Sequence, residues 1–430
     1  MKTSHVFISS ILCAAFHFLP VIVLSQPRAM TYEEYIREAA ALKEEIDVFL
    51  NESSWAQFDP DVGYILGNYS PHDGVDGSKT ISTVRQDGAR TSFVYTYRPC
   101  RINTYGNSFT QCHQVSDAET WQEYLAGHLG EPIRNYGMGG FGVYQAYRRM
   151  LREESTEKGA EYLMLYIWGD DHIRTLLRCR YALTRSWRHE QDKKEGVGIM
   201  FHGNFWCNIE MNMETGMLEE HESRIRSPEK LYQMTDPDWM HENLIDDLAL
   251  QMYLYEKGRI IDIDTKQMQK LAGYLNTEFN PDAEDMRQEI RQLLFKYAYA
   301  ATKYILKKSK EFARINDKKL MIILFDPYGS TRQLLDGEPR VDQEIVDFLE
   351  KNNFNYFDMN QVHAEDYKGF KLSQEEYYQR YFIGHYNPKG NHFFAFSIKP
   401  RIVEWLDPPP FTYRKSNTLP NDFKGYLEGN

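Results

Sequence analysis

The stretch NTYGNSFTQCHQVSDAETW, residues 103–121, places Ser108 in a glycine-containing turn between an apolar strand and a helix. The preceding residues, CRINTY at 100–105, have the pattern of a buried strand. Ser116 and Glu119 form a capping box, which marks the start of a helix. A strand that turns directly into a capped helix is the repeating unit of parallel sheets covered by helices. The stretch therefore predicts an α/β fold, and it raises the question whether Ser108 is a nucleophile or only suits the turn.

The same alternation of short apolar runs and helical segments continues along the chain. Further strands are expected at 131–136, 162–168, 319–326 and 354–358, and helices at 119–129, 137–154, 342–352 and 391–406. Because each expected strand is separated from the next by helical segments, the strands should form a parallel sheet. Each strand ends in polar or glycine-rich residues, which is typical of the edge of such a sheet that binds ligands.

The main domain is expected over residues 95–406, with an insertion at 173–317 that interrupts the pattern. Within the insertion, alternation around residues 214–216 predicts a β-hairpin. Helical spacing predicts helices over 236–258 and 283–316. The position of this mixed segment between strands of the sheet leads us to expect that it covers one edge of a cleft.

The N-terminal part of the chain reads as three successive segments. Residues 1–25 carry one charge, Lys2, and a long apolar run that ends in small residues, as in a secretory signal peptide; an uncleaved N-terminal anchor is the alternative. Residues 26–94 contain an expected helix at 31–50 and then an extended arm that we expect to pack on the main domain. A polar tail occupies residues 407–430. No later stretch is apolar enough to span a membrane, so the mature chain is expected to be secreted or periplasmic.

The amino-acid composition of the chain limits the kinds of partner that it is expected to bind. The chain has 430 residues, 42% of them hydrophobic, and a formal net charge of −12. That hydrophobic fraction is enough to bury a large core. The acidic balance repels phosphate backbones, which argues against nucleic acid as a partner. No spacing of ligand-type side chains points to a metal or to an organic cofactor.

Four cysteines remain after the expected signal peptide: Cys100, Cys112, Cys179 and Cys207. In an oxidising compartment this even number permits two disulfides, in any of three pairings. We slightly favour Cys100 with Cys112. The spacing of the cysteines is unlike that of a zinc site.

The expected strand ends carry a set of residues with coherent chemistry. Serine hydrolysis needs a hydroxyl, a base that accepts its proton, and donors for the oxyanion that forms on the attacked carbonyl. Ser108, His385 and the backbone N–H groups of Ser108 and Gly140 are able to supply all three.

Four blocks of sequence resemble the SGNH (GDSL-type) hydrolase family. They are YGNSFTQCHQVSDAETWQEYL at 105–125, NYGMGGFGVYQ at 135–145, IWGDDH at 167–172 and GHYNPKGNHFFA at 384–395. They occur in the order of the family, over residues 95–172 and 318–406. The resemblance implies the flavodoxin-like three-layer α/β/α fold of SGNH hydrolases, here with an N-terminal extension and a large mixed insertion.

The resemblance also assigns roles. Ser108 would be the nucleophile and His385 the base. The oxyanion hole would comprise the amides of Ser108 and Gly140 together with Asp170 or Asp171, one of which stands where the family has an asparagine. A carboxylate donates no hydrogen bond, so that position works only as a protonated acid. Such an acid would make activity greatest at mildly acidic pH.

Two further positions depart from the family pattern. The aspartate expected two or three residues before the catalytic histidine is replaced by Ile383 and Phe382. Asp358 and Asp326, at neighbouring strand ends, are the candidate substitutes, and a backbone carbonyl is another. Asn107 stands where the family has aspartate.

Two hypotheses for function result. In the first, the protein is a secreted esterase that hydrolyses a small-molecule or glycan ester, such as an O-acylated glycan, through an acyl-enzyme on Ser108. In the second, hydrolysis is weakened or lost and the cleft binds an acyl group, a glycan or a partner protein. His113 and His172 are near the site in sequence, and we interpret them as surface residues. His392 is interpreted as structural.

Overall fold

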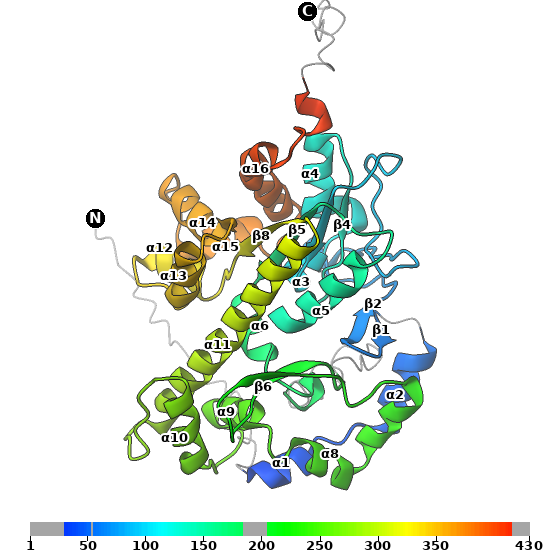
Figure 1. Cartoon of the computed structure of the whole chain (residues 1–430). Helices are drawn as coiled ribbons and strands as arrows, with labels where there is room; N and C mark the ends of the chain where they lie inside the picture. The colour runs from blue at the N-terminus through cyan, green and yellow to red at the C-terminus, as the bar shows by residue number, and fades with distance from the viewer. Residues whose placement is uncertain (1–29, 53–54, 184–203, 415–430) are drawn as a thin grey trace, which may run out of the picture.

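The computed structural model of the protein describes residues 30–52, 55–183 and 204–414. The expected signal peptide therefore lies outside the described residues, as does most of the C-terminal tail. The described chain is a mixed α/β structure built on a five-stranded parallel sheet (Figure 1). The strands are β3 Ile102–Tyr105, β4 Ile133–Asn135, β5 Tyr162–Ile167, β8 Lys319–Leu324 and β9 Tyr356–Asp358. All five expected strands of the sheet are confirmed, each shorter than its apolar run.

The order of the strands across the sheet is β4-β3-β5-β8-β9. In chain order this is 2-1-3-4-5, an order found in doubly wound sheets whose ligands bind where the winding reverses. The reversal lies between β3 and β5, which pair in parallel from Ile102 opposite Tyr162 to Tyr105 opposite Leu165. Since Ser108 follows β3 directly, the sheet places it at this switch point.

The two faces of the sheet contribute to two hydrophobic cores. In β5, the side chains of Leu163, Leu165 and Ile167 join one core, and those of Tyr162, Met164 and Tyr166 join the other. This alternation gives a strand with buried side chains on both faces. The first core is covered by α5 Val143–Glu154, α11 Met286–Ile315 and α13 Gln343–Lys351, and the second by α4 Trp121–Leu129 and α16 Pro388–Trp405. The result is three layers, helices on each side of the sheet (Figure 1).

Three helices follow strands β8 and β9 on one side of the sheet. They are α12 Ser330–Asp336, α14 Met359–Lys368 and α15 Gln374–Tyr381. The capping box of Ser373 with Glu376 starts α15, and the loop after it carries His385. This loop reaches α16, whose first turn is capped by the side chain of Asn387.

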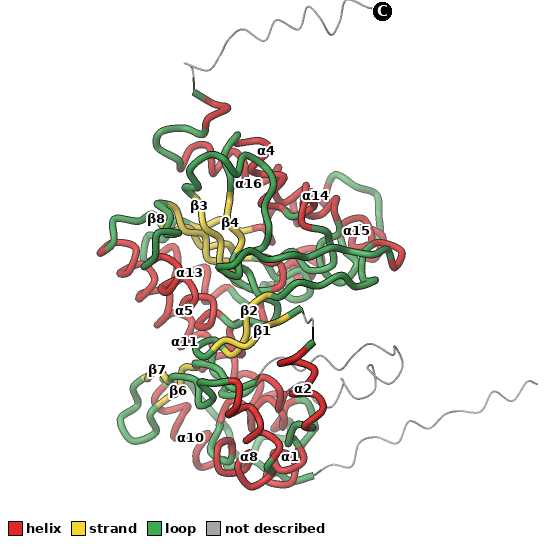
Figure 2. The backbone as a smooth tube through the Cα atoms, turned by 90° about the vertical axis from the view of Figure 1, so that its right-hand side faces the viewer, coloured by secondary structure: helices red, strands yellow, loops and turns green. Residues whose placement is uncertain are grey.

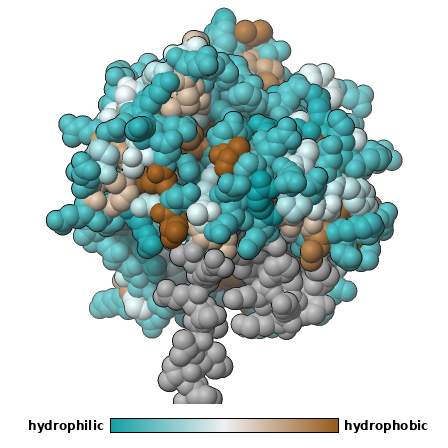
Figure 3. Space-filling view, turned by 90° about the horizontal axis from the view of Figure 1, so that it is seen from below, coloured by the Kyte–Doolittle hydropathy of each residue, from teal (hydrophilic) through white to brown (hydrophobic). Residues whose placement is uncertain are grey.

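The insertion forms a second body below the sheet, with the N-terminal helices packed on it (Figures 1 and 2). The helix α6 Gly169–Arg174 follows β5 and leads into the insertion, whose elements are β6 Asn208–Met211, β7 Leu218–His221, η3 Pro228–Thr235, α8 Pro237–Leu244, α9 Leu248–Glu256 and α10 Thr265–Tyr274. The hairpin predicted around residues 214–216 is confirmed by the antiparallel pairing of β6 with β7. The 30-residue helix α11 belongs to both bodies, since it begins beside α10 and ends against β8. Seen from below, this body is mainly hydrophilic with isolated hydrophobic residues (Figure 3).

One expected helix over residues 31–50 is two helices, α1 Tyr32–Glu38 and α2 Lys43–Asn51. The break has a tertiary cause. The Ala41 amide donates to the carbonyl of Met234 in η3 at 2.8 Å, so the backbone leaves the helix to bond to the insertion. The helical periodicity of the segment does not reveal a contact to a residue so distant in sequence.

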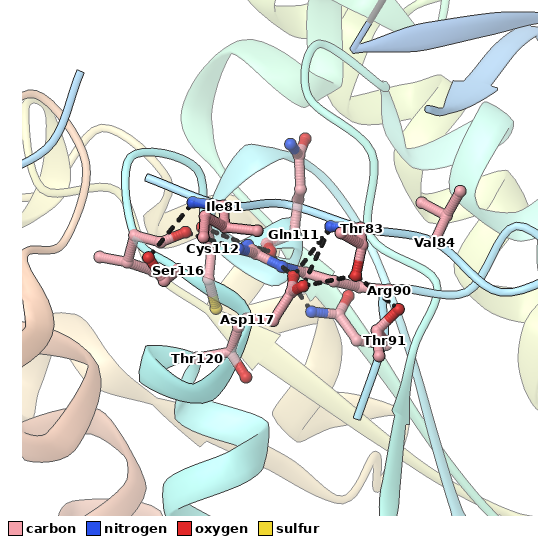
Figure 4. A network of polar contacts seen from close by, with 12 residues as sticks. Ile81, Thr83, Val84, Arg90, Thr91, Gln111, Cys112, Ser116, Asp117 and Thr120 are labelled. Carbon is pink, nitrogen blue, oxygen red and sulfur yellow. Dashed lines mark hydrogen bonds and ion pairs between the residues drawn. The ribbon is translucent and has the colours of Figure 1, made fainter. Parts of the chain in front are cut away.

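The arm after these helices packs on the sheet domain, as predicted. It contains the hairpin β1 Ala56–Asp59 and β2 Gly63–Leu66 and the short η1 Val75–Gly77. Its main anchor is Arg90, which is buried and forms an ion pair with Asp117 at 2.8 Å (Figure 4). The same guanidinium donates to the carbonyls of Gln111, Cys112 and Val115, at 2.5–2.6 Å. These carbonyls belong to the segment that follows Ser108, so the arm is anchored to the turn that carries Ser108.

The structure shows no disulfide between Cys100 and Cys112, the favoured pair. Both residues are free thiols. No helix among the described residues combines the length and the apolar character that crossing a bilayer requires.

Candidate active site

The site begins at the turn after β3, where Asn107 caps the short helix α3 Ser108–Gln111. The side chain of Asn107 accepts a hydrogen bond from the Phe109 amide at 2.8 Å. Ser108 is the first residue of α3, and within the described chain its own N–H donates to no acceptor. Its side chain is buried at 7% exposure. The turn therefore presents a hydroxyl and a free amide at the carboxyl edge of the sheet.

Ser108 and His385, 277 residues apart, are in hydrogen-bond contact: the Oγ of Ser108 lies 2.8 Å from the Nε2 of His385. The Nδ1 of His385 lies 2.9 Å from the Oε1 of Gln114. The same Oε1 accepts the backbone N–H of His385 at 2.8 Å. A hydroxyl, an imidazole and an amide side chain thus form one continuous chain of hydrogen bonds.

The protonation of this chain is fixed by the backbone contact. A backbone N–H can only donate, so the Gln114 atom beside it must be the carbonyl oxygen. That oxygen can only accept, so Nδ1 of His385 carries the proton. Nε2 then has its lone pair directed at the Ser108 hydroxyl. This is the tautomer that a general base for Ser108 requires.

Gln114 reaches His385 because of two local backbone features. Cys112 and Gln114 have left-handed backbone conformations, with φ of 61° and 68°. Such conformations are uncommon for residues other than glycine and are concentrated at functional sites. On the other side, Gly384 has φ of 108°, and a Cβ there would lie 2.8 Å from the Gln114 oxygen. Glycine at 384 therefore leaves the space in which Gln114 approaches.

The arm supplies the second layer of contacts through Asp73. The backbone carbonyl of Asp73 accepts a hydrogen bond from Nε2 of Gln114 at 3.3 Å. Its carboxylate lies 3.5 Å from the Nε2 of His113 and accepts the Thr80 hydroxyl at 2.6 Å. A single arm residue therefore positions both Gln114 and His113.

The imidazole of His385 is buried beside an aromatic ring, and the groups that influence its charge, His113 and Arg174, are basic. Its ring centroid lies 5.0 Å from that of Phe109 and 5.0 Å from that of His113. Burial lowers the pKa of His385 well below its usual value, and the nearby His113 and Arg174 lower this pKa further. His385 is therefore neutral at pH 7 and available as a base. No carboxylate is in hydrogen-bond contact with the ring in the described structure.

The glycine-rich loop after β4 lies against the turn that carries Ser108. The Met138 amide donates to the carbonyl of Gly106 at 3.0 Å, and the Gly139 amide donates to the Gln111 side chain at 2.7 Å. The next residue, Gly140, has φ of 84°, and among the described residues its N–H has no acceptor. The loop therefore carries a free backbone donor next to the turn that carries Ser108.

The insertion also contacts this loop. A Cβ at Gly140 would lie 2.2 Å from the guanidinium carbon of Arg180, which shows how closely that side chain packs on the loop. The Nη1 of Arg180 donates to the hydroxyl of Tyr64 at 3.1 Å. The insertion thus contacts the glycine-rich loop through Arg180, and the expectation that it covers one edge of a cleft stays a prediction.

The two acidic candidates for the oxyanion hole have different surroundings. The side chain of Asp170 is 60% exposed and pairs with Arg174 at 3.2 Å. Asp171 is buried, and its Oδ2 accepts the side-chain amide of Asn107 at 2.5 Å and the Trp168 amide at 2.8 Å. Burial raises the pKa of Asp171 to about 7.

Asp171 therefore acts as an acceptor, and the expectation of a third oxyanion donor at this position does not match these contacts. Its Oδ1 also accepts from Arg174, at 3.3 Å. Asn107 and Asp171 thus form a buried pair of one amide and one carboxyl beside the turn that carries Ser108.

The expected orienters of His385 are wrong. Asp326 accepts the indole N–H of Trp168 at 2.9 Å and the amides of the turn before α12. Asp358 pairs with Arg340 and caps α14 through the Asn360 amide at 3.1 Å. Both carboxylates are engaged away from the imidazole, whose Nδ1 faces Gln114.

Sequence reasoning also missed the position of His113. Its side chain is half-buried, at 27% exposure, and its ring packs beside that of His385 and also faces Trp55 at 6.0 Å. His172 is buried, with Nδ1 2.8 Å from the hydroxyl of Thr302. The only sequence signal for Gln114 and His113 was their proximity to Ser108.

The described residues contain no group of three or more His, Cys, Asp or Glu side chains placed to hold a metal ion. No model of a known protein family matches this chain, and no curated protein matches it. A function for this chain is therefore inferred from the geometry of the site.

Proposed function

We propose that this protein is a serine esterase of the SGNH type, in which Ser108 attacks the ester carbonyl and His385 is the general base. The observation that carries the proposal is the contact of 2.8 Å between the Ser108 hydroxyl and Nε2 of His385, with Nδ1 bonded to Gln114. A nucleophile, a base and a group that orients the base are the three parts that this chemistry needs.

In the acylation step, the Ser108 oxygen bonds to the carbonyl carbon as its proton passes to Nε2 of His385. The carbonyl oxygen becomes an oxyanion, which the free N–H groups of Ser108 and Gly140 would stabilise. When the intermediate collapses, the bond to the alcohol oxygen breaks and His385 returns the proton to that oxygen. The alcohol leaves, and the acyl group stays on Ser108.

In the deacylation step, His385 takes a proton from water, whose oxygen attacks the acyl carbon. The second oxyanion uses the same two donors. Collapse breaks the bond to Ser108, and His385 gives the proton back to the Ser108 oxygen. The products are a carboxylic acid and the free enzyme, so no external reductant, oxidant or cofactor takes part.

Gln114 distinguishes this proposed site from a triad with a carboxylate. Its carbonyl holds the same tautomer that a carboxylate would hold. It carries no charge, so it stabilises the imidazolium of the transition state less. We therefore propose a slow esterase, with an ester on a glycan or small molecule as substrate.

The second candidate is a protein that binds such a group with little or no hydrolysis. The absence of a carboxylate beside His385 and the engagement of Asp171 with Asn107 favour it. Both candidates would use the residues around Ser108, and both are proposed to act outside the cytoplasm, which the apolar run in residues 1–25 supports.

Hydrolysis of a short-chain p-nitrophenyl ester by the purified mature protein tests the proposal. The Ser108→Ala and His385→Ala variants are compared with Ser155→Ala, a matched loss of a hydroxyl from an exposed position at the end of α5. The esterase predicts a rate that both site variants lose, by about 10³-fold or more, and that the control keeps. Equal rates for all variants would leave only the binding candidate.

A further inference from the structure

A second concave surface lies between α4, α15 and α16, away from the Ser108 turn. It is a hollow of about 530 Å³, which we call the α16 groove, and its walls include Tyr124, Arg380, Lys389, His392, Phe393 and Phe396. This volume is within the usual range for a small-molecule site. A protein–protein interface or a track for a nucleic acid strand would need a more extended surface.

One face of α16 supplies most of the groove. Residues 389, 392, 393 and 396 are spaced at i, i+3, i+4 and i+7, so they line one side of the helix. The same face continues to Lys399, whose ammonium lies 4.6 Å from the centre of the Phe396 ring. Basic side chains therefore flank two aromatic side chains along one face of this helix.

The aromatic floor of the groove is both exposed and fixed. Phe396 is 56% exposed, although it is a large hydrophobic residue. Phe393 stacks on Tyr381 with ring centroids 4.8 Å apart, and Tyr124 packs against His392 at 5.3 Å. Rings held in this way offer flat apolar faces, and a sugar ring presents an apolar C–H face that matches them.

The rim of the groove carries uncompensated positive charge. In the part of the chain that the structure describes, Arg380, Lys389 and Lys399 form no ion pair, although the chain has 62 acidic residues against 50 basic ones. The guanidinium of Arg380 lies over the Phe370 ring at 4.9 Å. The nearby Asp366 accepts the hydroxyls of Tyr377 and Tyr381 at 3.0 Å. A local surplus of cations on an acidic protein is complementary to an anionic ligand.

We propose that the α16 groove binds an anionic glycan, a short segment of sugar chain that bears carboxylate groups. Sugar faces pack on Phe396 and Phe393, and the carboxylates pair with Arg380, Lys389 and Lys399. Binding here does not require hydrolysis at Ser108, so it can be measured on a protein that cannot turn over an ester.

The test is isothermal titration of the Ser108→Ala protein with tetragalacturonate, with maltotetraose as a neutral sugar chain of the same length. Lys389→Glu and Phe396→Ala are each introduced into that protein. The matched controls are Lys266→Glu, an exposed lysine of α10, and Phe93→Ala, an aromatic residue of the arm that is 60% exposed. Thermal unfolding of every variant confirms that it is folded.

The proposal expects tetragalacturonate to bind at least about tenfold more tightly than maltotetraose. Each groove variant should weaken that binding at least about tenfold, and each control should change it less than about twofold. No binding at millimolar concentration would overturn the proposal. Equal affinity for the neutral sugar, an equal loss in the controls, or tighter binding of a short single-stranded oligonucleotide would also overturn it. The esterase proposal is unaffected by any of these outcomes, since its assay uses the wild-type protein.

Discussion

Replacing Gln114 with glutamate would place a carboxylate where the proposed site has a neutral amide. The two side chains have nearly the same shape, so the new oxygen would occupy the position of the amide oxygen, 2.9 Å from Nδ1 of His385. Attraction between unit charges at this distance of 2.9 Å is about 6 kcal/mol at an effective dielectric of 20. The imidazolium exists only as the reaction proceeds, so this attraction stabilises the transition state more than the ground state.

Two costs reduce that gain. The amide of Gln114 donates to the carbonyl of Asp73 at 3.3 Å, and loss of this hydrogen bond costs about 1 kcal/mol. The second oxygen of the glutamate would also face that carbonyl, and the half-buried carboxylate loses part of its hydration. We therefore expect kcat/KM to rise by about tenfold to a hundredfold, which corresponds to about 1.4–2.8 kcal/mol.

The assay is the pH dependence of kcat/KM for a short-chain p-nitrophenyl ester. His385 acts as a base only when it is neutral, so activity is lost as the pH falls through its pKa. Burial lowers this pKa in the wild type, so the loss should occur well below the usual range for histidine. The added carboxylate raises the pKa, and the acidic limb of the profile should move to higher pH in Gln114→Glu.

Gln288→Glu is the matched control, because it adds the same charge at an exposed position in the first turn of α11. It should change neither the rate nor the limb. A Gln114→Glu protein that is no faster than wild type at any pH, and whose acidic limb stays in place, would contradict this expectation. That result would mean that Gln114 does not hold the imidazole during the reaction.

Three further predictions concern stability and the backbone of the site. The pKa of Asp171 is raised from 3.8 to about 7 in the folded protein, so the native state holds a proton between these pH values that the unfolded state releases. The free energy of unfolding should then decrease as pH rises through this interval, by up to about 4 kcal/mol, and Asp171→Asn should flatten the decrease in urea titrations. Arg90→Met leaves the carboxylate of Asp117 buried and unpaired, and should lower the free energy of unfolding by about 3–5 kcal/mol. Gly140→Ala adds backbone strain of about 1–2 kcal/mol, because the residue is left-handed, and a steric clash in the loop, and it should reduce the rate of hydrolysis at least about tenfold. The control is Gly77→Ala, where φ is 71° and no heavy atom lies within 4 Å of the added Cβ. This control should carry the same backbone strain without the clash and should keep the rate of hydrolysis.

Each of these predictions has an outcome that contradicts it. An unchanged pH dependence in Asp171→Asn would show that another group titrates in that interval. Arg37 forms exposed ion pairs with Glu33 and Asp238, so Arg37→Met should cost less than about 1 kcal/mol. If the Arg90 and Arg37 substitutions lowered the free energy of unfolding equally, burial of the Arg90–Asp117 ion pair would not be what stabilises the arm. Full activity in Gly140→Ala would exclude the Gly140 amide from the oxyanion hole.

The sequence predicted the sheet well because strand burial is a local signal. The apolar runs that became β5 and β8 have side chains that alternate between two cores, and such strands read as continuous hydrophobic segments. The hairpin of β6 and β7 was also predictable, since alternation and turn residues lie next to each other in the chain. The insertion at residues 173–317 was also predictable, because the alternation of apolar strands and helices stops there and resumes after it.

The parts of the site that were not predicted depend on contacts between distant segments. Gln114 faces His385 only because the backbone at Gln114 is left-handed and because Asp73, from the arm, holds its amide group. No local pattern encodes either fact. The candidates Asp326 and Asp358 were reasonable as strand-end carboxylates, but each is fully used by the turn or helix that follows it.

The central claim is that Ser108 is a nucleophile activated by His385, and covalent labelling tests it most directly. The wild-type protein is incubated with an alkyl fluorophosphonate, digested, and its peptides are identified by mass spectrometry. The account predicts a phosphonyl adduct on Ser108, formed far more slowly in His385→Ala and absent in Ser108→Ala. A wild-type protein that stays unlabelled under conditions that label a known serine esterase, or one labelled only at another residue, would contradict it.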